Sequence, residues 1–213
     1  MKKIFLAISL LIAASVSMVQ AQEDVKVRFG FTAGFAMTKW NGDFDLGGED
    51  FSFSPGTSFN PGFRAGVVAE LQMSAKWSVQ PELLFSYEGT KLDSIGTASA
   101  MYIKTPILVY RNFQNIGPGQ LSPAIGPYFS FGLGGTTDGE ETLGYDGIAE
   151  KFDWGLQFRI NYEMQSKVEG LFAYIGYEQG LTSTYNMGIM VGLGYKFAYS
   201  KWLKSANKGI FSY

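Results

Sequence analysis

Hydrophobic and polar residues alternate along most of this chain, so that every second side chain is apolar. In residues 152–163 the even positions are apolar, beginning with Phe152 and Trp154, and the odd positions are polar or glycine. A period of two residues predicts β-strands, because successive side chains of a strand point to opposite faces. The same alternation runs through residues 27–38, 63–72 and 77–88.

Four further segments alternate less regularly, and they are residues 101–111, 122–134, 170–181 and 185–197. The chain is therefore predicted to contain eight strands of about 10–13 residues, and a tilted strand needs roughly 9–11 residues to cross a bilayer. We predict an all-β fold: a single eight-stranded antiparallel transmembrane β-barrel with short periplasmic turns and longer extracellular loops.

The apolar face of these strands can meet either lipid or a protein interior, because a soluble sandwich or lipocalin-like barrel alternates in the same way. Two features favour lipid. The polar face combines Gly, Ser and Gln with charges of both signs, which is typical of a small polar lumen. Aromatic residues also gather toward the strand ends, where girdles form at the two membrane surfaces. These aromatics are Phe29, Trp77, Tyr87, Tyr110, Phe152, Trp154, Tyr162, Tyr195 and Phe197.

Long and short connections alternate between the predicted strands. The long ones are residues 39–61, 89–100 and 135–150. The short ones are residues 73–76, the turn at Gly117-Pro118-Gly119 and residues 164–169, and the last connection, residues 182–184, is also short. In outer-membrane barrels the short turns face the periplasm, so both termini are expected on that side.

The first residues have the features of a secretory signal peptide. Lys2 and Lys3 precede the apolar residues 4–14, and Val19 and Ala21 are small residues placed for cleavage after Ala21. An apolar core of about eleven residues is too short for a membrane-spanning helix, which needs roughly 20. We therefore predict a cleaved signal peptide at 1–21, a barrel domain at 22–197 and a periplasmic C-terminal extension at 198–213.

Composition narrows the chemistry of the protein. The chain has no His and no Cys, which excludes disulfides and catalysis through imidazole or thiolate. A net charge of −2 gives no reason to expect nucleic acid as a partner. No cofactor and no catalytic residue is predicted.

Several predicted strands carry short motifs. They are Gly30-Phe31-Thr32-Ala33-Gly34, Phe63-Arg64-Ala65-Gly66, Gln80-Pro81-Glu82-Leu83-Leu84-Phe85-Ser86 and Tyr102-Ile103-Lys104-Thr105-Pro106-Ile107-Leu108-Val109-Tyr110, with weaker ones at Gly126-Pro127-Tyr128, Asp153-Trp154-Gly155 and Tyr177-Glu178-Gln179-Gly180-Leu181. With these motifs nearly the whole mature chain resembles the porin-family, PorT-like outer-membrane β-barrel proteins of Bacteroidota. The resemblance implies an eight-stranded outer-membrane barrel and carries over no ligand and no catalytic residue. The chain departs from the family at Lys104, where an acid is frequent, and in continuing past Phe197.

Charged residues on the polar faces predict a network of ion pairs in the lumen. An eight-stranded barrel is only wide enough for side chains to fill it, so charges inside must pair. The predicted network comprises Arg64, Glu70, Glu82, Lys104, Arg159, Glu178 and Lys196. Catalysis by carboxylates alone is the alternative for Glu70, Glu82, Glu88 and Glu178. We expect loss of Arg159 to destabilise the barrel.

The first long connection contains the second group of candidate residues. Phe51, Phe53 and Phe59 stand among Ser, Gly and Pro, where exposed aromatics can contact a protein or glycan partner or fold back over the barrel mouth. The spacing Asn41-x-Asp43-x-Asp45 resembles the start of a calcium loop. Leu46 replaces its glycine, however, so a solvated acidic loop is expected and no metal site is predicted.

These observations favour a non-enzymatic protein of the Gram-negative outer membrane with a structural or interaction role through its extracellular loops. Its expected partners are outer-membrane lipid, the barrel assembly and export machinery, and an unknown extracellular or periplasmic protein or glycan. A narrow small-solute pore and an accessory role in protein secretion remain the alternatives.

Overall fold

The computed structural model describes residues 26–41, 44–45, 52–53, 57–92, 96–137, 140–142, 152–165, 168–182 and 185–198. The predicted signal peptide and all but the first residue of the predicted C-terminal extension lie outside these ranges. Within the described ranges, no helix is long and apolar enough to cross a membrane.

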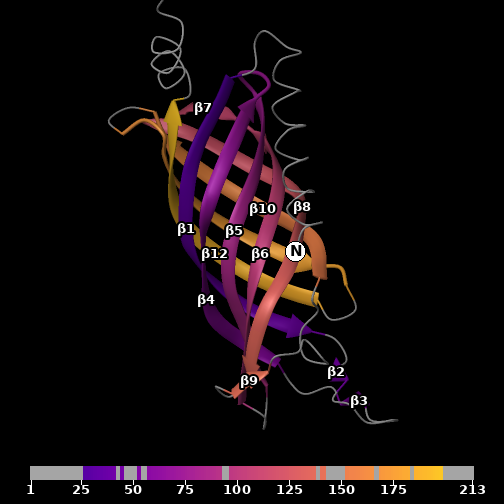
Figure 1. Ribbon diagram of the computed structural model, residues 1–213. Coiled ribbons are helices and arrows are strands. Elements are labelled where there is room, and N and C mark those ends of the chain that lie inside the picture. The colour runs from indigo at the N-terminus through magenta and orange to yellow at the C-terminus, as the bar shows by residue number, and fades with distance from the viewer. Residues whose placement is uncertain are drawn as a thin grey trace, which may run out of the picture.

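Eight long strands form the body of the molecule (Figure 1). They are β1 (Lys26–Asn41), β4 (Thr57–Gln72), β5 (Trp77–Leu92), β6 (Gly96–Arg111), β8 (Gly119–Thr137), β10 (Phe152–Met164), β11 (Leu171–Gly180) and β12 (Tyr185–Ala198). The shorter strands are β2 (Phe44–Asp45), β3 (Ser52–Phe53), β7 (Phe113–Ile116) and β9 (Glu140–Thr142).

The eight long strands close into an antiparallel barrel. Their order is β10-β11-β12-β1-β4-β5-β6-β8, and β8 pairs with β10 to complete the ring. Among the described residues β7 and β9 pair with the two ends of β8, and β2 pairs with β3. Closure leaves the long strands no free edge and satisfies their backbone hydrogen bonds internally, as a membrane barrel requires. The predicted eight-stranded barrel is confirmed.

The strands reach further at the end with the long connections than the sequence pattern predicted. The connection predicted at residues 89–100 is mostly strand, because β5 continues to Leu92 and β6 begins at Gly96. Thr90 still pairs with Ala98 there, and Lys91 with Thr97. The alternation of apolar and polar residues ends before the strands do, because the backbone hydrogen bonds between β5 and β6 continue after the outward side chains stop being apolar. The β1, β4 and β8 strands are likewise longer at this end.

The two faces of the strands differ as predicted, with polar side chains inside and apolar ones outside. On β1, Phe35 is 74% exposed whereas Thr32 is 3% exposed. Residues paired directly across an antiparallel ladder point to the same side, so Gly34, Arg64 and Ser86 carry the inner face from β1 through β4 to β5. Because the register preserves this alternation around the ring, the polar faces of all eight strands enclose one lumen.

Outward Trp and Tyr side chains lie toward the two ends of the strands, as girdles would. The described ones are Trp77, Tyr162 and Tyr195 toward the short turns and Tyr87, Trp154 and Tyr177 toward the other end. The prediction was wrong for Tyr110, which is 2% exposed and lies in the lumen. Even-numbered residues of β6 point inward, so the position of Tyr110 near a strand end did not determine its side.

Candidate functional site

Charged side chains from seven of the eight long strands, all but β8, point into the lumen. The described ones are Arg28, Arg64, Lys104, Arg159 and Lys196, with Glu70, Glu82, Glu88, Asp153, Glu163 and Glu178. The alternation of each strand places them there, because their neighbours in the sequence face outward. They gather into three groups of ion pairs and one separate aspartate.

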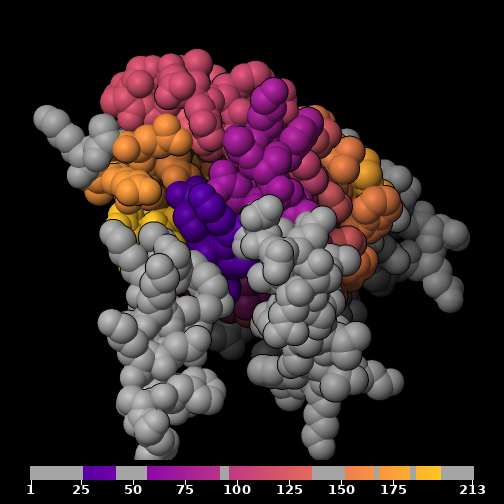
Figure 2. All heavy atoms as spheres, turned by 90° about the horizontal axis from the view of Figure 1, so that it is seen from above, coloured from indigo at the N-terminus to yellow at the C-terminus, as the bar shows by residue number. Residues whose placement is uncertain are grey.

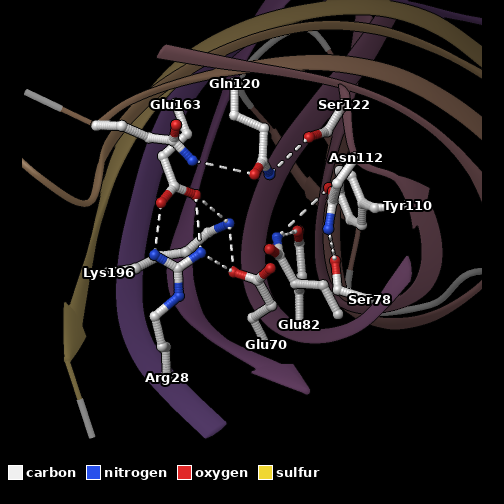
Figure 3. A network of polar contacts seen from close by, with 12 residues as sticks. Arg28, Glu70, Ser78, Glu82, Tyr110, Asn112, Gln120, Ser122, Glu163 and Lys196 are labelled. Atoms are coloured by element: carbon white, nitrogen blue, oxygen red, sulfur yellow. Dashed lines mark hydrogen bonds and ion pairs between the residues drawn. The ribbon is translucent and has the colours of Figure 1, made fainter. Parts of the chain in front are cut away.

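The first group lies near the short turns and joins four strands (Figure 3). Arg28 Nη2 of β1 is 2.6 Å from Glu70 Oε2 of β4, and Arg28 also pairs with Glu163 of β10. Lys196 Nζ of β12 is 2.8 Å from Glu70 Oε2 and 3.0 Å from Glu163 Oε2. The two cations and two carboxylates balance. Because β1 and β10 are not neighbours in the barrel, the group ties distant parts of the wall together.

The second group is a single pair, Arg159 of β10 and Glu82 of β5. The guanidinium donates from Nη1 and Nη2 to the two carboxylate oxygens at 2.5 and 3.1 Å. Gln80 Nε2 donates to the same carboxylate at 2.6 Å, and the Arg159 guanidinium lies 4.3 Å from the centre of the Tyr174 ring. The pair crosses the lumen between strands that are not adjacent, and both side chains are fully buried.

The third group contains Arg64, Lys104, Glu88 and Glu178. Arg64 donates to both oxygens of Glu178 and to Glu88 Oε1, each at 3.0 Å. Lys104 Nζ lies 2.7 Å from Glu88 Oε1 and 2.6 Å from Glu178 Oε1. Asn186 donates a further hydrogen bond to Glu88. These four charged side chains balance one another while being at most 1% exposed.

Asp153 is the one lumen carboxylate of the described residues that forms no ion pair. It accepts hydrogen bonds from the Tyr128 hydroxyl at 2.8 Å and from Thr182 Oγ1 at 2.7 Å. The ammonium nitrogen of Lys104 lies over the Tyr128 ring, 4.9 Å from its centre. Hydroxyl donors thus solvate Asp153 in place of a cation.

Aromatic side chains fill the space beside the ion pairs. Tyr174 and Phe172 of β11 pack with Met190 in a buried cluster. A Cβ at Gly192 would lie 2.5 Å from the Tyr174 ring, so only glycine leaves room for it. Gly194 makes room for Phe172 in the same way. Glycines on the inner face of β12 therefore let large side chains of β11 occupy the lumen.

The structure brings all seven residues of the predicted charge network into the lumen, each in contact with a charge of opposite sign. Lys104, the departure from the family pattern, pairs with two glutamates. Four lumen charges were missing from the predicted network: Arg28, Glu88, Asp153 and Glu163. Glu88 was considered only among the lumen carboxylates. The positions of all four on the polar faces of residues 27–38, 77–88 and 152–163 could have identified them.

The predicted loop residues are only partly described. Phe51 lies outside the described residues, and Phe53 belongs to β3, where only its backbone pairing with Phe44 is described. The prediction of a loop position was wrong for Phe59, which is part of β4. The Lys39 ammonium lies 5.5 Å from the centre of its ring. Within the described part of the chain, no three His, Cys, Asp or Glu residues are grouped to hold a metal ion.

The sequence and the fold both match known proteins. The family described as "Outer membrane protein beta-barrel domain" matches residues 20–186. The solved structure of OprG from Pseudomonas aeruginosa is similar, with a TM-score of 0.50 and 12% identity over 81% of this chain and 96% of that one. The structure of Neisserial surface protein A has a TM-score of 0.46 and 14% identity over 79% of this chain and 97% of that one. The structure of Ail from Yersinia pestis has a TM-score of 0.43 and 13% identity over 81% of this chain and 99% of that one.

No curated protein matches this chain. At identities of 12–14% the structural likeness concerns the fold alone.

Proposed function

This chain belongs to the family of outer membrane protein β-barrel domains, and from that premise we propose that it is a non-enzymatic integral outer-membrane protein with a closed lumen. In this proposal the barrel is a structural support, and the work is done by the segments at the end with the long connections. The observation that carries the proposal is the series of buried ion pairs across the lumen.

Each group of ion pairs obstructs the lumen independently. A barrel of eight strands is only wide enough for side chains to fill. The Arg159–Glu82 pair crosses it, and the groups around Glu70 and Glu178 lie toward its two ends. Separating one partner from a buried pair costs about 3–5 kcal/mol, so passage of a solute would require several such costs in succession. The summed free-energy cost of separating these ion pairs disfavours a channel.

The chemistry of the chain supports a role without catalysis. With no His and no Cys, neither an imidazole base nor a thiolate nucleophile is present. The buried glutamates of the lumen are engaged by arginine and lysine, which leaves no described ion-paired carboxylate exposed as an acid or base. The carboxylate-only alternative therefore has no accessible pair of acids among the described residues.

The finer parts of the proposal rest on the sequence. Lys2, Lys3 and the apolar residues that follow support export to a Gram-negative outer membrane with cleavage after Ala21. The motif Gln80-Pro81-Glu82 and its neighbours support the PorT-like group of Bacteroidota, and an accessory role in secretion has no support beyond that resemblance. The proposed partners are lipid, the assembly and export machinery, and an extracellular or periplasmic protein or glycan.

A narrow pore is the second candidate, because the lumen is lined by polar residues. The test is single-channel recording of the refolded mature chain in a planar bilayer, using protein whose gel mobility shifts on heating. We expect no conductance steps, while a large porin added to the same bilayer as a positive control conducts. Reproducible steps that scale with salt concentration would overturn the closed lumen and favour the pore.

The interaction role needs a test of its own. Replacing residues 42–56 and 138–151 by short Gly-Ser linkers removes the long connections and keeps the strands that close the barrel. In the native cell we expect this variant to reach the outer membrane at the wild-type level and to reproduce the phenotype of deleting the protein. Full complementation by the shortened chain would show that the long connections are dispensable.

A further inference from the structure

The four arginines of the chain occupy two different environments. Arg28, Arg64 and Arg159 point into the lumen, and each pairs with carboxylates. Arg111, the last residue of β6, is on the outward face at the end with the short turns. Among the described residues it forms no ion pair, and its contacts are with aromatic rings.

Two rings hold the Arg111 guanidinium at the strand end. Its central carbon lies 4.9 Å from the centre of the Trp77 ring and 5.7 Å from that of Phe113. Trp77 stands directly opposite Arg111 in the β5–β6 ladder, and Phe113 begins β7. Both rings are nearly half exposed. The guanidinium is therefore positioned by cation–π contacts, and its hydrogen-bond donors have no carboxylate partner in the described part of the chain.

A second basic residue lies in the turn that precedes β5. Lys76, in the turn before β5, is exposed, and its carbonyl accepts a hydrogen bond from the Asn112 backbone at 2.8 Å. That bond fixes the turn against the residue that follows Arg111. In the view onto this end, β5 in magenta and the segment around β7 in pink lie side by side (Figure 2). The backbone of Lys76 therefore lies next to the end of β6, which is Arg111.

The outward surface of the strands carries charge only near their ends. Among the described residues the outward charges are Arg111 at one end and Lys39 and Lys91 at the other. A strand of 16 residues such as β5 rises about 40 Å at about 3.3 Å per residue and a tilt of about 40°. The hydrophobic band of such a barrel is about 25 Å tall. Arg111 therefore stands at the level of the lipid headgroups.

We propose that Arg111, with Lys76, binds the phosphate group of a phospholipid in the periplasmic leaflet. The planar guanidinium can donate two parallel hydrogen bonds to phosphate while it remains stacked on Trp77 and Phe113. The acyl chains lie along Val79 and Val109, which pair across β5 and β6 on the same outward face. The site rests on the proposed outer-membrane location with the short turns in the periplasm, and it holds whether or not the lumen conducts.

Native mass spectrometry of the folded protein in a non-ionic detergent tests this site with dioleoylphosphatidylglycerol and with dioleoylglycerol, which lacks the phosphate. A basic residue near an anionic lipid surface contributes about fivefold in affinity, so Arg111→Gln should weaken binding of the phospholipid about fivefold. The affinity of Arg111→Lys for the phospholipid should lie between those of the wild type and Arg111→Gln. Dioleoylglycerol should bind equally to all variants.

Lys39→Gln is the matched control, because it removes an outward cation at the opposite end and should leave phospholipid binding unchanged. Equal phospholipid binding by wild type and Arg111→Gln would overturn the proposal. So would an equal loss in Arg111→Gln and Lys39→Gln, which would indicate a response to net charge. Heat-dependent gel mobility shows that each variant is folded, and conductance is measured separately.

Discussion

The pair of Arg159 and Glu82 offers the sharpest test of the idea that ion pairs hold the barrel wall together. Arg159→Met leaves Glu82 buried with only the Gln80 amide as a strong donor within hydrogen-bond distance. Glu82→Met leaves the Arg159 guanidinium buried without its carboxylate. Removing both partners together leaves two apolar side chains of similar length in their place.

The expected losses in free energy of unfolding follow from the complete burial of Arg159 and Glu82. Breaking a buried pair by removing one partner costs about 3–5 kcal/mol, whereas replacing both partners by apolar residues is often close to neutral. We therefore expect each single variant to lose about 3–5 kcal/mol and the double variant to lose much less than the sum. At an m-value of about 2 kcal/mol per molar urea, each single loss lowers the midpoint by about 1.5–2.5 M.

The assay is urea unfolding of the refolded mature chain in micelles, followed by tryptophan fluorescence and by heat-dependent gel mobility. Lys91→Met is the control, since it removes an exposed cation from the outer surface of β5 and should change the free energy of unfolding by less than about 0.5 kcal/mol. The reasoning is refuted if the loss in free energy of unfolding of the double variant equals the sum of the two single losses. It is also refuted if the urea midpoint of Arg159→Met equals that of the wild type.

The remaining predictions concern the two faces of the wall. Val67→Arg, on the outward face in the middle of β4, should lower the free energy of unfolding in lipid vesicles by about 2–4 kcal/mol. Ile116→Arg in β7 should lower it by about 1 kcal/mol or less. Equally small losses for both variants in an unfolding titration would mean that Val67 does not face lipid. Gly192→Ala brings a methyl group to 2.5 Å from the Tyr174 ring and 2.6 Å from the Ala33 carbonyl oxygen and should cost about 1–3 kcal/mol. The methyl group of Gly134→Ala would meet only Met101 Cε, at 4.0 Å, so this variant should be nearly neutral. A matching urea midpoint for these two glycine variants would show that Tyr174 can move aside.

The interior of this barrel could be assigned from the sequence because a strand has only two faces. Once residues 152–163 are a strand, Asp153, Arg159 and Glu163 must share a side, and the apolar residues between them must take the other. Lipid outside and a narrow lumen inside then place those charges within the barrel. The same reasoning fails for Tyr110, because an aromatic side chain is compatible with either face and its position near a strand end suggested the girdle.

The pairing of the charges was decided by closure of the ring. Arg159 and Glu82 are 77 positions apart, and Arg28 and Glu163 are 135 apart, on strands that are not neighbours. Which side chains meet across the lumen depends on the tilt and stagger of the strands, which are properties of the closed barrel. Strand pattern alone therefore determined which residues point inward, whereas only the tertiary structure decided their partners, because the distances across the lumen exist only after β8 has joined β10.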